Sequence, residues 1–479
     1  MRSSAGRSGK NGPNLECTSE ACTRMPEEIW DRLFRWVESI MGGKIVWKER
    51  QPRWRPAWYF DVEVGGRTVP LYWRGFRGRR DRRPSVYDRY PIEQEAALLQ
   101  VLEAHGIPVP HVYGFCPDPR GILMARAPGK AEFHHIPDEA EREALAREFM
   151  EILARTHRIP PEAFEAIGME RPRTPEEQAL NIVSAFEEEY RASIRTPVPL
   201  LEFTLRWLRR NIPPRMGPTV LVQGDTGPGQ FLFQNGKVTA VIDWEFAHLG
   251  HPMCDLAMIR ARDLCYPFGD LRERFRLYSE LVGTPLDMPA LRYYSVVAMS
   301  TTPLGTASVI ESPPRSIDYA EYLSWYVLYS RAMVECMAEA AGIPLGPVPL
   351  PEASPSPRAM AFDVVLKNLR EEQLPRITDP YTAYRMNIAV RLVEYARSAD
   401  ALGPATDAAD LEDLGALLGR RPENLPKGNA ELVALIHAAG PERDADLIRY
   451  FHRHLVRWEN MLKPAMGEMA VTGTLSPIE

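Results

Sequence analysis

Cysteine is scarce in this chain, with six residues scattered among 479. Only Cys17 and Cys22 lie close together, and with no further Cys or His beside them they would make a weak metal site. The sequence therefore predicts no disulfide framework, and reduced thiols in a cytoplasmic protein are the expectation.

Long apolar stretches and a surplus of positive charge are also missing. No uninterrupted apolar run approaches the length that spans a bilayer, so no transmembrane helix is predicted. Residues 1–24 are rich in Ser, Gly, Asn and Arg without an apolar centre, which predicts a disordered tail and not a secretory signal. The net charge of −6 argues against a general nucleic-acid binder, because such proteins present basic faces. We therefore expect neither nucleic acid nor membrane as a partner.

The remaining composition is that of a folded, soluble protein, with 45% hydrophobic and 25% charged residues. A length of 479 residues exceeds a single core and predicts roughly two to four domains. Repeated prolines between Pro344 and Pro357 cannot extend a helix or join a central strand, so residues 343–358 are predicted to be a linker. Residues 359–479 are predicted to form a small helical bundle, because apolar residues share one helical face in three segments. These are Phe362, Val365, Leu366 and Leu369; Met386, Ala389, Val390 and Val393; and Ile448, Phe451, Leu455 and Leu462.

The segment from Val220 to Ala257 carries the clearest chemical pattern. Asn235-Gly236 stands between the apolar runs Phe231–Phe233 and Val238–Ile242, which is a strong hairpin signal. A two-residue turn would place Gln230 opposite Val241. Asp243 would then leave the second strand at the end where Asp225 enters the first, so that two carboxylates and a carboxamide converge.

Convergent oxygen ligands of this kind suit Mg²⁺, which binds one or two carboxylates together with water and phosphate oxygens. The pattern predicts phosphoryl transfer, in which Asp225 is the base, Asp243 the principal metal ligand and Gln230 a secondary ligand. Either Asp, taken alone, is also typical of a residue that caps a turn. Three such positions on one hairpin favour the catalytic interpretation.

The segment resembles the catalytic core of the aminoglycoside phosphotransferase and choline kinase-like superfamily. The matching residues are Gln223-Gly224-Asp225, then Gln230, then Asp243-Trp244-Glu245, then Gly250 to Ala257 with Asp255 inside it. The resemblance implies an α+β, bilobal protein-kinase-like fold with a small β-rich amino-terminal lobe and a mainly helical second lobe. It also implies ATP and Mg²⁺ as cofactors, and a structural role for Asp255 in anchoring the lobe.

Two residues depart from the family pattern. Gln223 stands where the family has His, and an amide can donate and accept hydrogen bonds in its place. Gln230 replaces the metal-binding Asn, and the extra methylene moves its oxygen by about 1.5 Å. Because Mg²⁺ demands near-ideal geometry, a nucleotide-binding pseudokinase that acts as an interaction protein stays open as an alternative.

The amino-terminal lobe is predicted at residues 25–125, and the helical lobe at residues 126–342. Gly65-Gly66 joins two β-prone runs into a second hairpin, and Arg74 ends its second strand. A helix is predicted to begin at Glu95, whose carboxylate would pair with Arg74 as the helix glutamate of kinases does. The resemblance places the adenine contacts on the backbone near Met124 and Arg126.

The Gly-rich loop of this family is missing between the first two strands. Arg53 and Arg55 stand there, and either bind nucleotide phosphate by charge or belong to a solvated loop. A second basic run is either a solvated loop or a site for an anionic thioester substrate. It consists of Arg77, Arg79, Arg80, Arg82 and Arg83.

The helical lobe contains a predicted helix over Glu148–His157, in which His157 is interpreted as a capping or packing residue. Glu187-Glu188-Glu189 would suit a polycationic antibiotic, although a solvated helix face is the favoured interpretation. Aromatic residues that line either an acceptor pocket or the core are Tyr190, Trp207, Tyr266, Tyr293 and Tyr294.

Within the superfamily, the chain resembles the acyl-CoA dehydrogenase-associated branch more than the antibiotic-resistance enzymes. The resemblance rests on Pro84 to Asp88, which lead into Glu95. Its last 120 or so residues resemble the small helical companion of hydroxyacyl-CoA kinases, through segments such as Asn387–Arg397. The resemblance implies an ATP-dependent kinase for the hydroxyl group of a small molecule, with a hydroxyacyl-CoA thioester as the preferred substrate class. An antibiotic or other secondary-metabolite kinase is the alternative enzyme. The choice of ATP over GTP and a homo-oligomeric state stay open.

Overall fold

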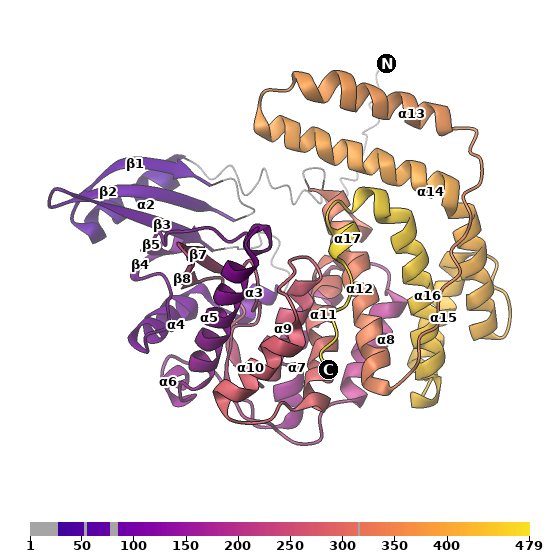
Figure 1. The fold of residues 1–479 in the computed structure, drawn as a ribbon, viewed down its shortest axis with the longest axis horizontal. Helices are drawn as coiled ribbons and strands as arrows, with labels where there is room; N and C mark the ends of the chain where they lie inside the picture. The colour runs from indigo at the N-terminus through magenta and orange to yellow at the C-terminus, as the bar shows by residue number, and fades with distance from the viewer. Residues whose placement is uncertain (1–26, 52–54, 77–84, 315–316) are drawn as a thin grey trace, which may run out of the picture.

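The structure, a computed structural model, describes residues 27–51, 55–76, 85–314 and 317–479. Its amino-terminal lobe is built on a five-stranded antiparallel sheet in the order β1-β2-β3-β5-β4 (Figure 1). The strands are β1 Lys44–Arg50, β2 Ala57–Val64, β3 Arg67–Gly75, β4 Val112–Pro117 and β5 Arg120–Ala125. The predicted second hairpin is confirmed as β2–β3, with positive φ at both Gly65 and Gly66.

Helices cover both faces of this sheet, because alternate residues of a strand point to opposite faces. Helix α2 (Glu27–Met41) packs on the face that carries Leu123, in a core with Leu33 and Val37. Helix α4 (Ile92–Ala104) packs on the face that carries Ile122. The prediction that α4 begins at Glu95 is wrong by three residues, since the helix begins directly after Pro91.

Tryptophan is concentrated in the contact between α2 and the sheet. The Trp30 ring lies 5.5 Å from Trp58 and 6.1 Å from Trp73, centroid to centroid, with its edge against each of them. Such edge-to-face contacts add to the energy of area burial. Trp73 is fully buried, so this cluster forms the centre of the amino-terminal core.

The helical lobe comprises a short helix before α4 and the elements after β5, and it holds most of the hydrophobic core. Two short strand pairs, β6–β9 and β7–β8, lie among its helices. The elements are α3 Val86–Arg89, η1 Phe133–His135, α5 Glu139–His157, α6 Glu162–Glu165, α7 Pro175–Ser193, α8 Pro199–Arg210, β6 Val220–Val222, β7 Phe231–Gln234, β8 Lys237–Val241, β9 His248–Gly250, α9 Met253–Asp263, α10 Leu271–Val282, α11 Met288–Glu311 and α12 Tyr319–Ala341. The helix predicted over Glu148–His157 is the second half of α5.

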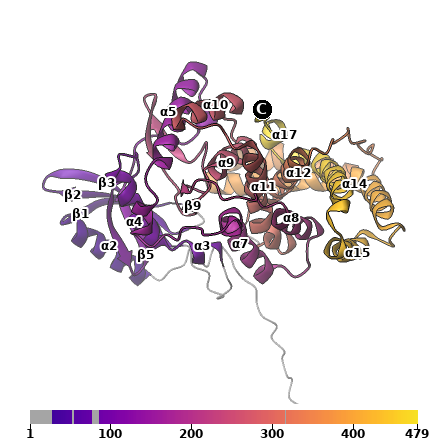
Figure 2. The same ribbon diagram turned by 90° about the horizontal axis from the view of Figure 1, so that it is seen from below.

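Residues 343–358 contain no helix or strand, and the carboxy-terminal helices follow them. These helices are α13 Ala359–Lys367, η2 Asn368–Gln373, η3 Leu374–Arg376, α14 Pro380–Leu418, α15 Leu425–Ala438, η4 Pro441–Arg443, α16 Asp444–Leu462, η5 Lys463–Ala465 and α17 Met469–Thr472. Most of these helices, α14 and α15 among them, lie at the end of the molecule opposite the sheet (Figure 2). Their buried residues join the core of the helical lobe, as where Phe451 of α16 stacks on Phe203 of α8. The face predicted for α13 is buried only at Leu366.

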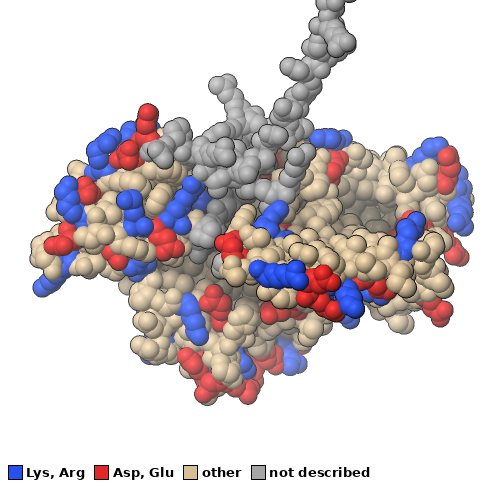
Figure 3. All heavy atoms as spheres, turned by 90° about the horizontal axis from the view of Figure 1, so that it is seen from above, with Lys and Arg blue, Asp and Glu red and all other residues tan. Residues whose placement is uncertain are grey.

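The surface carries both signs of charge. On the face shown in Figure 3, acidic and basic side chains are interspersed over the described residues. No helix among the described residues is long and apolar enough to cross a membrane.

Candidate active site

The hairpin predicted around Asn235-Gly236 is confirmed as β7–β8. Asn235 and Gly236 have φ values of 53° and 69°, so both turn residues are left-handed, as a two-residue hairpin of matching twist requires. The turn is therefore the one that the sequence predicts.

The predicted register of this hairpin is wrong by one residue. Phe231 lies opposite Val241, so Gln230 comes to lie opposite Ile242, whose amide donates to the Gln230 carbonyl at 2.9 Å. The register shifts at Thr239, which has no partner in the ladder and donates its hydroxyl to the carbonyl of Pro128 at 2.5 Å. This bulge brings Gln230 one residue nearer to Asp243.

Asp225, Gln230 and Asp243 come together at the open end of the hairpin. The Gln230 side-chain amide donates to the Asp225 carboxylate, which also accepts from Arg262 Nη1 at 2.8 Å. Asp243 has a φ of 64°, an uncommon left-handed conformation for a residue with a side chain. Its carboxylate is 35% exposed, more than those of its acidic neighbours, and is therefore accessible to a ligand.

Asp255 holds the loop that carries Asp225. Its buried carboxylate accepts from the backbone amides of Gln223 and Gly224 at 3.0 and 3.2 Å, and from the Thr226 hydroxyl. His157 donates Nε2 to the same carboxylate at 3.0 Å. Although burial opposes it, these donors lower the pKa of Asp255 and keep it charged.

The amide of Gln223 braces the same loop from the other side. Its Nε2 donates to the carbonyl of Ile242 at 2.7 Å, which ties the loop to the end of β8. Gly224 has a φ of 86°, and a Cβ there would lie 2.5 Å from the Phe246 carbonyl oxygen. Only glycine lets these two loops approach so closely.

Arg74 faces this hairpin from the amino-terminal lobe. It forms a bidentate pair with Glu95 of α4, with both N–O distances at 2.7 Å. Arg74 also donates to Glu245 at 3.1 Å and lies 3.4 Å from Asp243. The predicted Arg74–Glu95 pair is therefore present, and it contacts residues that follow the β7–β8 hairpin.

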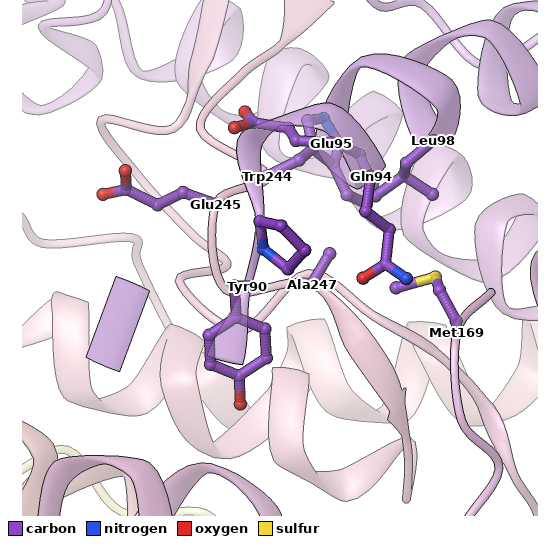
Figure 4. A pocket seen from close by; sticks show the side chains of 9 residues that line it. Tyr90, Gln94, Glu95, Leu98, Met169, Trp244, Glu245 and Ala247 are labelled. Carbon is purple, nitrogen blue, oxygen red and sulfur yellow. The ribbon is translucent and has the colours of Figure 1, made fainter. Parts of the chain in front are cut away.

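Arg55 of the β1–β2 connection joins the same network through an ion pair with Glu245. Glu95 and Glu245 line a small cavity behind the site together with the Trp244 ring, as Figure 4 shows. The other lining residues that are labelled there are Tyr90, Gln94, Leu98, Met169 and Ala247.

Among the described residues, this network contains four carboxylates and three guanidinium groups. Asp225, Asp243, Glu95 and Glu245 face Arg55, Arg74 and Arg262, and all are at least partly buried. Burial raises the pKa of Asp225 against the opposing charge of Arg262. Burial and the nearby charge of Asp243 raise the pKa of Glu245 to about 7.

The donor set fits a divalent cation of the magnesium type. Carboxylate and carboxamide oxygens are hard ligands of the kind that Mg²⁺ binds. Asp243, which is 35% exposed, and Gln230, which is buried beside Asp225, would hold it.

The remaining predicted nucleotide contacts lie in the sheet. The backbone amide of Arg126 donates to the Pro70 carbonyl at 3.1 Å, and its guanidinium pairs with Asp61 at 2.6 Å. Met124 is buried in β5, between β3 and β4. Both residues thus lie in or beside the sheet, and these contacts are with residues other than Asp225 and Asp243. Arg53, the basic run at residues 77–83, and Cys17 and Cys22 lie outside the described residues, as does the predicted tail.

The acidic run on α7 is occupied by arginines of the same chain. Glu187 contacts Arg191 and Arg209, and Glu188 contacts Arg89 at 3.0 Å. Four of the five aromatic candidates are core residues, namely Tyr190, Trp207, Tyr293 and Tyr294, and only Tyr266 is partly exposed.

Arg262 is a site residue that the sequence interpretation missed. It donates to Asp225 and also to the carbonyl of Pro228 at 2.7 Å. It stands seven residues after Asp255 on α9, two helical turns further along the same face. That spacing could have indicated it, since Asp255 anchors the loop of Asp225.

The chain is similar to known proteins over part of its length. Residues 71–294 match the family described as phosphotransferase enzyme family. Acyl-CoA dehydrogenase family member 10 of Mus musculus is 28% identical over 210 residues, 40% of this chain and 19% of that protein. Acyl-CoA dehydrogenase family member 11 of Rattus norvegicus is 29% identical over 178 residues, 35% of this chain and 22% of that protein. The chain thus spans about a fifth of the length of these curated relatives.

A solved structure shares the fold. The crystal structure of a putative aminoglycoside phosphotransferase from Ralstonia eutropha is 20% identical, with a TM-score of 0.51 over 67% of this chain and 99% of that one. The predicted kinase-like fold is confirmed by this likeness. The chain therefore carries, over residues 71–294, a domain of the phosphotransferase enzyme family.

Proposed function

We propose that this protein transfers the terminal phosphoryl group of ATP to a hydroxyl group of a small molecule. The observation that carries the proposal is the meeting of Asp225, Gln230 and Asp243 at one end of the β7–β8 hairpin, facing Arg74. Phosphoryl transfer needs a base, an oxygen-rich metal site and a cation near the phosphates, and these residues supply all three.

Asp225 is the base in this proposal. The substrate hydroxyl oxygen attacks the terminal phosphorus, the bond to the bridging oxygen breaks, and ADP leaves with the electron pair. The hydroxyl proton passes to the Asp225 carboxylate, which Arg262 and Gln230 hold in place. A proton acceptor fixed by two donors is already oriented before the substrate arrives.

Asp243 and Gln230 would hold Mg²⁺, and the ion would neutralise charge on the nucleotide phosphates. The side-chain nitrogen of Gln230, Nε2, donates to Asp225, so the side-chain oxygen Oε1 is the atom left for a metal. The register of the hairpin brings Gln230 opposite Ile242, the residue directly before Asp243. Arg74, held by Glu95, would bind the phosphates.

The acceptor class we propose is a hydroxyacyl-CoA. The matching relatives are named acyl-CoA dehydrogenase family members. An acyl-CoA is the class of compound on which both a kinase domain and a dehydrogenase domain could act. Phosphorylation would convert the hydroxyl group into a leaving group for later elimination. The antibiotic alternative is weakened, because arginines already neutralise Glu187 and Glu188.

Calorimetry with ATP, in the presence and absence of Mg²⁺, tests the nucleotide site. ADP release is then measured against hydroxyacyl-CoAs, aminoglycosides and simple alcohols. We expect Mg²⁺-dependent binding and release that hydroxyacyl-CoAs stimulate. Stimulation by another class of alcohol would reject the proposed acceptor but not the kinase.

Binding without turnover across this panel would favour the pseudokinase. No binding at all would overturn the interpretation of the hairpin.

A further inference from the structure

A cluster of metal-ligating side chains lies apart from the candidate active site, where η1 meets the segment before α17. His134, His135 and Glu468 each offer one ligand atom, and these atoms all lie within 4.8 Å of one another. His135 Nε2 is 3.8 Å from Glu468 Oε2, and the two imidazole rings are 4.0 Å apart, centroid to centroid. Two segments far apart in the sequence therefore present one set of ligands.

The backbone on each side of this cluster is anchored by buried neighbours. Phe133 is 2% exposed and packs against Phe268 at 5.2 Å, which fixes η1. Ala465 and Met466 are buried just before Glu468. The side chains of His135 and Glu468 are 56% and 77% exposed, so they can rotate towards a ligand from a fixed backbone.

Two imidazoles and a carboxylate are a ligand set that zinc uses with a water molecule in the fourth position. In a tetrahedral site with bonds of about 2.0–2.2 Å, the ligand atoms lie roughly 3.3 Å apart. Side-chain rotations that move the ligand atoms of the exposed residues by about 1 Å would therefore close the site. We propose that His134, His135 and Glu468 bind one zinc-class divalent ion. Imidazole suits zinc, whereas Mg²⁺ prefers oxygen ligands, so the Mg²⁺ that accompanies a nucleotide would not occupy this site.

An ion here would join η1, which follows β5, to the carboxy-terminal helices. It would also fix the His134 ring, which lies 5.1 Å from the Tyr266 ring. Tyr266 in turn lies under the guanidinium of Arg262 at 5.4 Å, and Arg262 holds Asp225. The site is thus in contact, through two side chains, with the residue proposed as the base.

The test is calorimetric titration with ZnCl₂ of the full chain, purified without a polyhistidine tag, in excess Mg²⁺. We expect one ion per chain. His135→Ala and Glu468→Gln should each weaken binding at least tenfold, on the order of the loss expected even for supporting residues of metal sites. His105→Ala, a substitution at an exposed histidine of the other lobe, serves as the matched control and should bind as the unchanged protein does.

X-ray absorption at the zinc edge then reports the ligands. Two imidazole nitrogens and a carboxylate oxygen at about 2.0–2.2 Å would support the site. Absence of one-to-one binding, or equal affinity in both variants and the control, would overturn the proposal. Neither readout needs turnover, so failure here is distinguishable from failure of the proposed kinase activity.

Discussion

Asp225 and Asp243 have the same functional group but different surroundings. Donors from Arg262 and Gln230 hold Asp225, whereas Asp243 is the more exposed of the two. We predict that Asp225→Asn lowers kcat by about 10²–10⁴ and leaves the Kd for ATP unchanged, because a general base contributes about that factor. Asp243→Asn should instead weaken binding of ATP with Mg²⁺. Calorimetry and steady-state kinetics measure both.

Asp31→Asn, at an exposed position on α2, is the control for handling and for loss of one charge. Full turnover in the Asp225 variant would exclude it as the base.

His251 gives the folded state a dependence on pH. Burial lowers its pKa to about 4, with Asp287 opposing and His157 assisting, whereas the unfolded value is near 6.5. Between these values the unfolded chain binds a proton that the folded chain does not, so stability falls as pH decreases from about 6.5 to 4. We predict that His251→Asn removes up to about 3 kcal/mol of this dependence. Urea unfolding at pH 7 and pH 4.5 measures it.

Asn is chosen because it can still accept from the Met253 amide, as His251 Nδ1 does at 3.1 Å. His105→Asn, at an exposed position, is expected to keep the original profile. Parallel profiles for the His251 variant and the unchanged protein would contradict the assignment.

At the scale of elements, the Arg74–Glu95 pair fixes β3 against α4. Both side chains are less than 10% exposed, and removing one partner of a buried pair leaves the other charge uncompensated. We predict that Glu95→Leu destabilises the protein by roughly 3 kcal/mol, the lower end for such pairs, because Glu245 still contacts Arg74. Urea unfolding measures the loss, and nucleotide binding should weaken in the same variant.

Glu93 supplies the matched control. It stands two residues earlier on α4 and pairs with Arg120, with both side chains more than 40% exposed. Glu93→Leu should therefore cost less than about 1 kcal/mol. An equal loss of unfolding free energy in the two variants would show that the buried pair stabilises the fold no more than the exposed pair does.

The two hairpins were predictable because each depends on local sequence. Asn235-Gly236 forms its turn wherever apolar strands flank it. The register was not predictable, since the bulge at Thr239 depends on a contact with Pro128. The bond from Arg262 to Asp225 likewise depends on how α9 packs against the hairpin. Tertiary contacts of this kind leave only weak signals in a single sequence.

At the scale of the whole molecule, the carboxy-terminal helices are inseparable from the helical lobe. Phe451 stacks on Phe203, Arg331 pairs with Glu459, and Arg457 lies buried between acidic residues of α14. We predict that residues 126–342 and 359–479 unfold together, because neither buries its apolar surface alone. Scanning calorimetry should give one transition for them, with equal calorimetric and van't Hoff enthalpies. Two separated transitions would show that the predicted linker joins independent domains.

The tryptophan cluster gives the amino-terminal lobe its own optical signature. The Trp30 ring lies about 6 Å from the rings of both Trp58 and Trp73, near enough for their excited states to couple. This cluster should therefore contribute to the tryptophan bands of the near-ultraviolet circular dichroism spectrum. The opening of the lobe can be followed in solution without a dye or an engineered label.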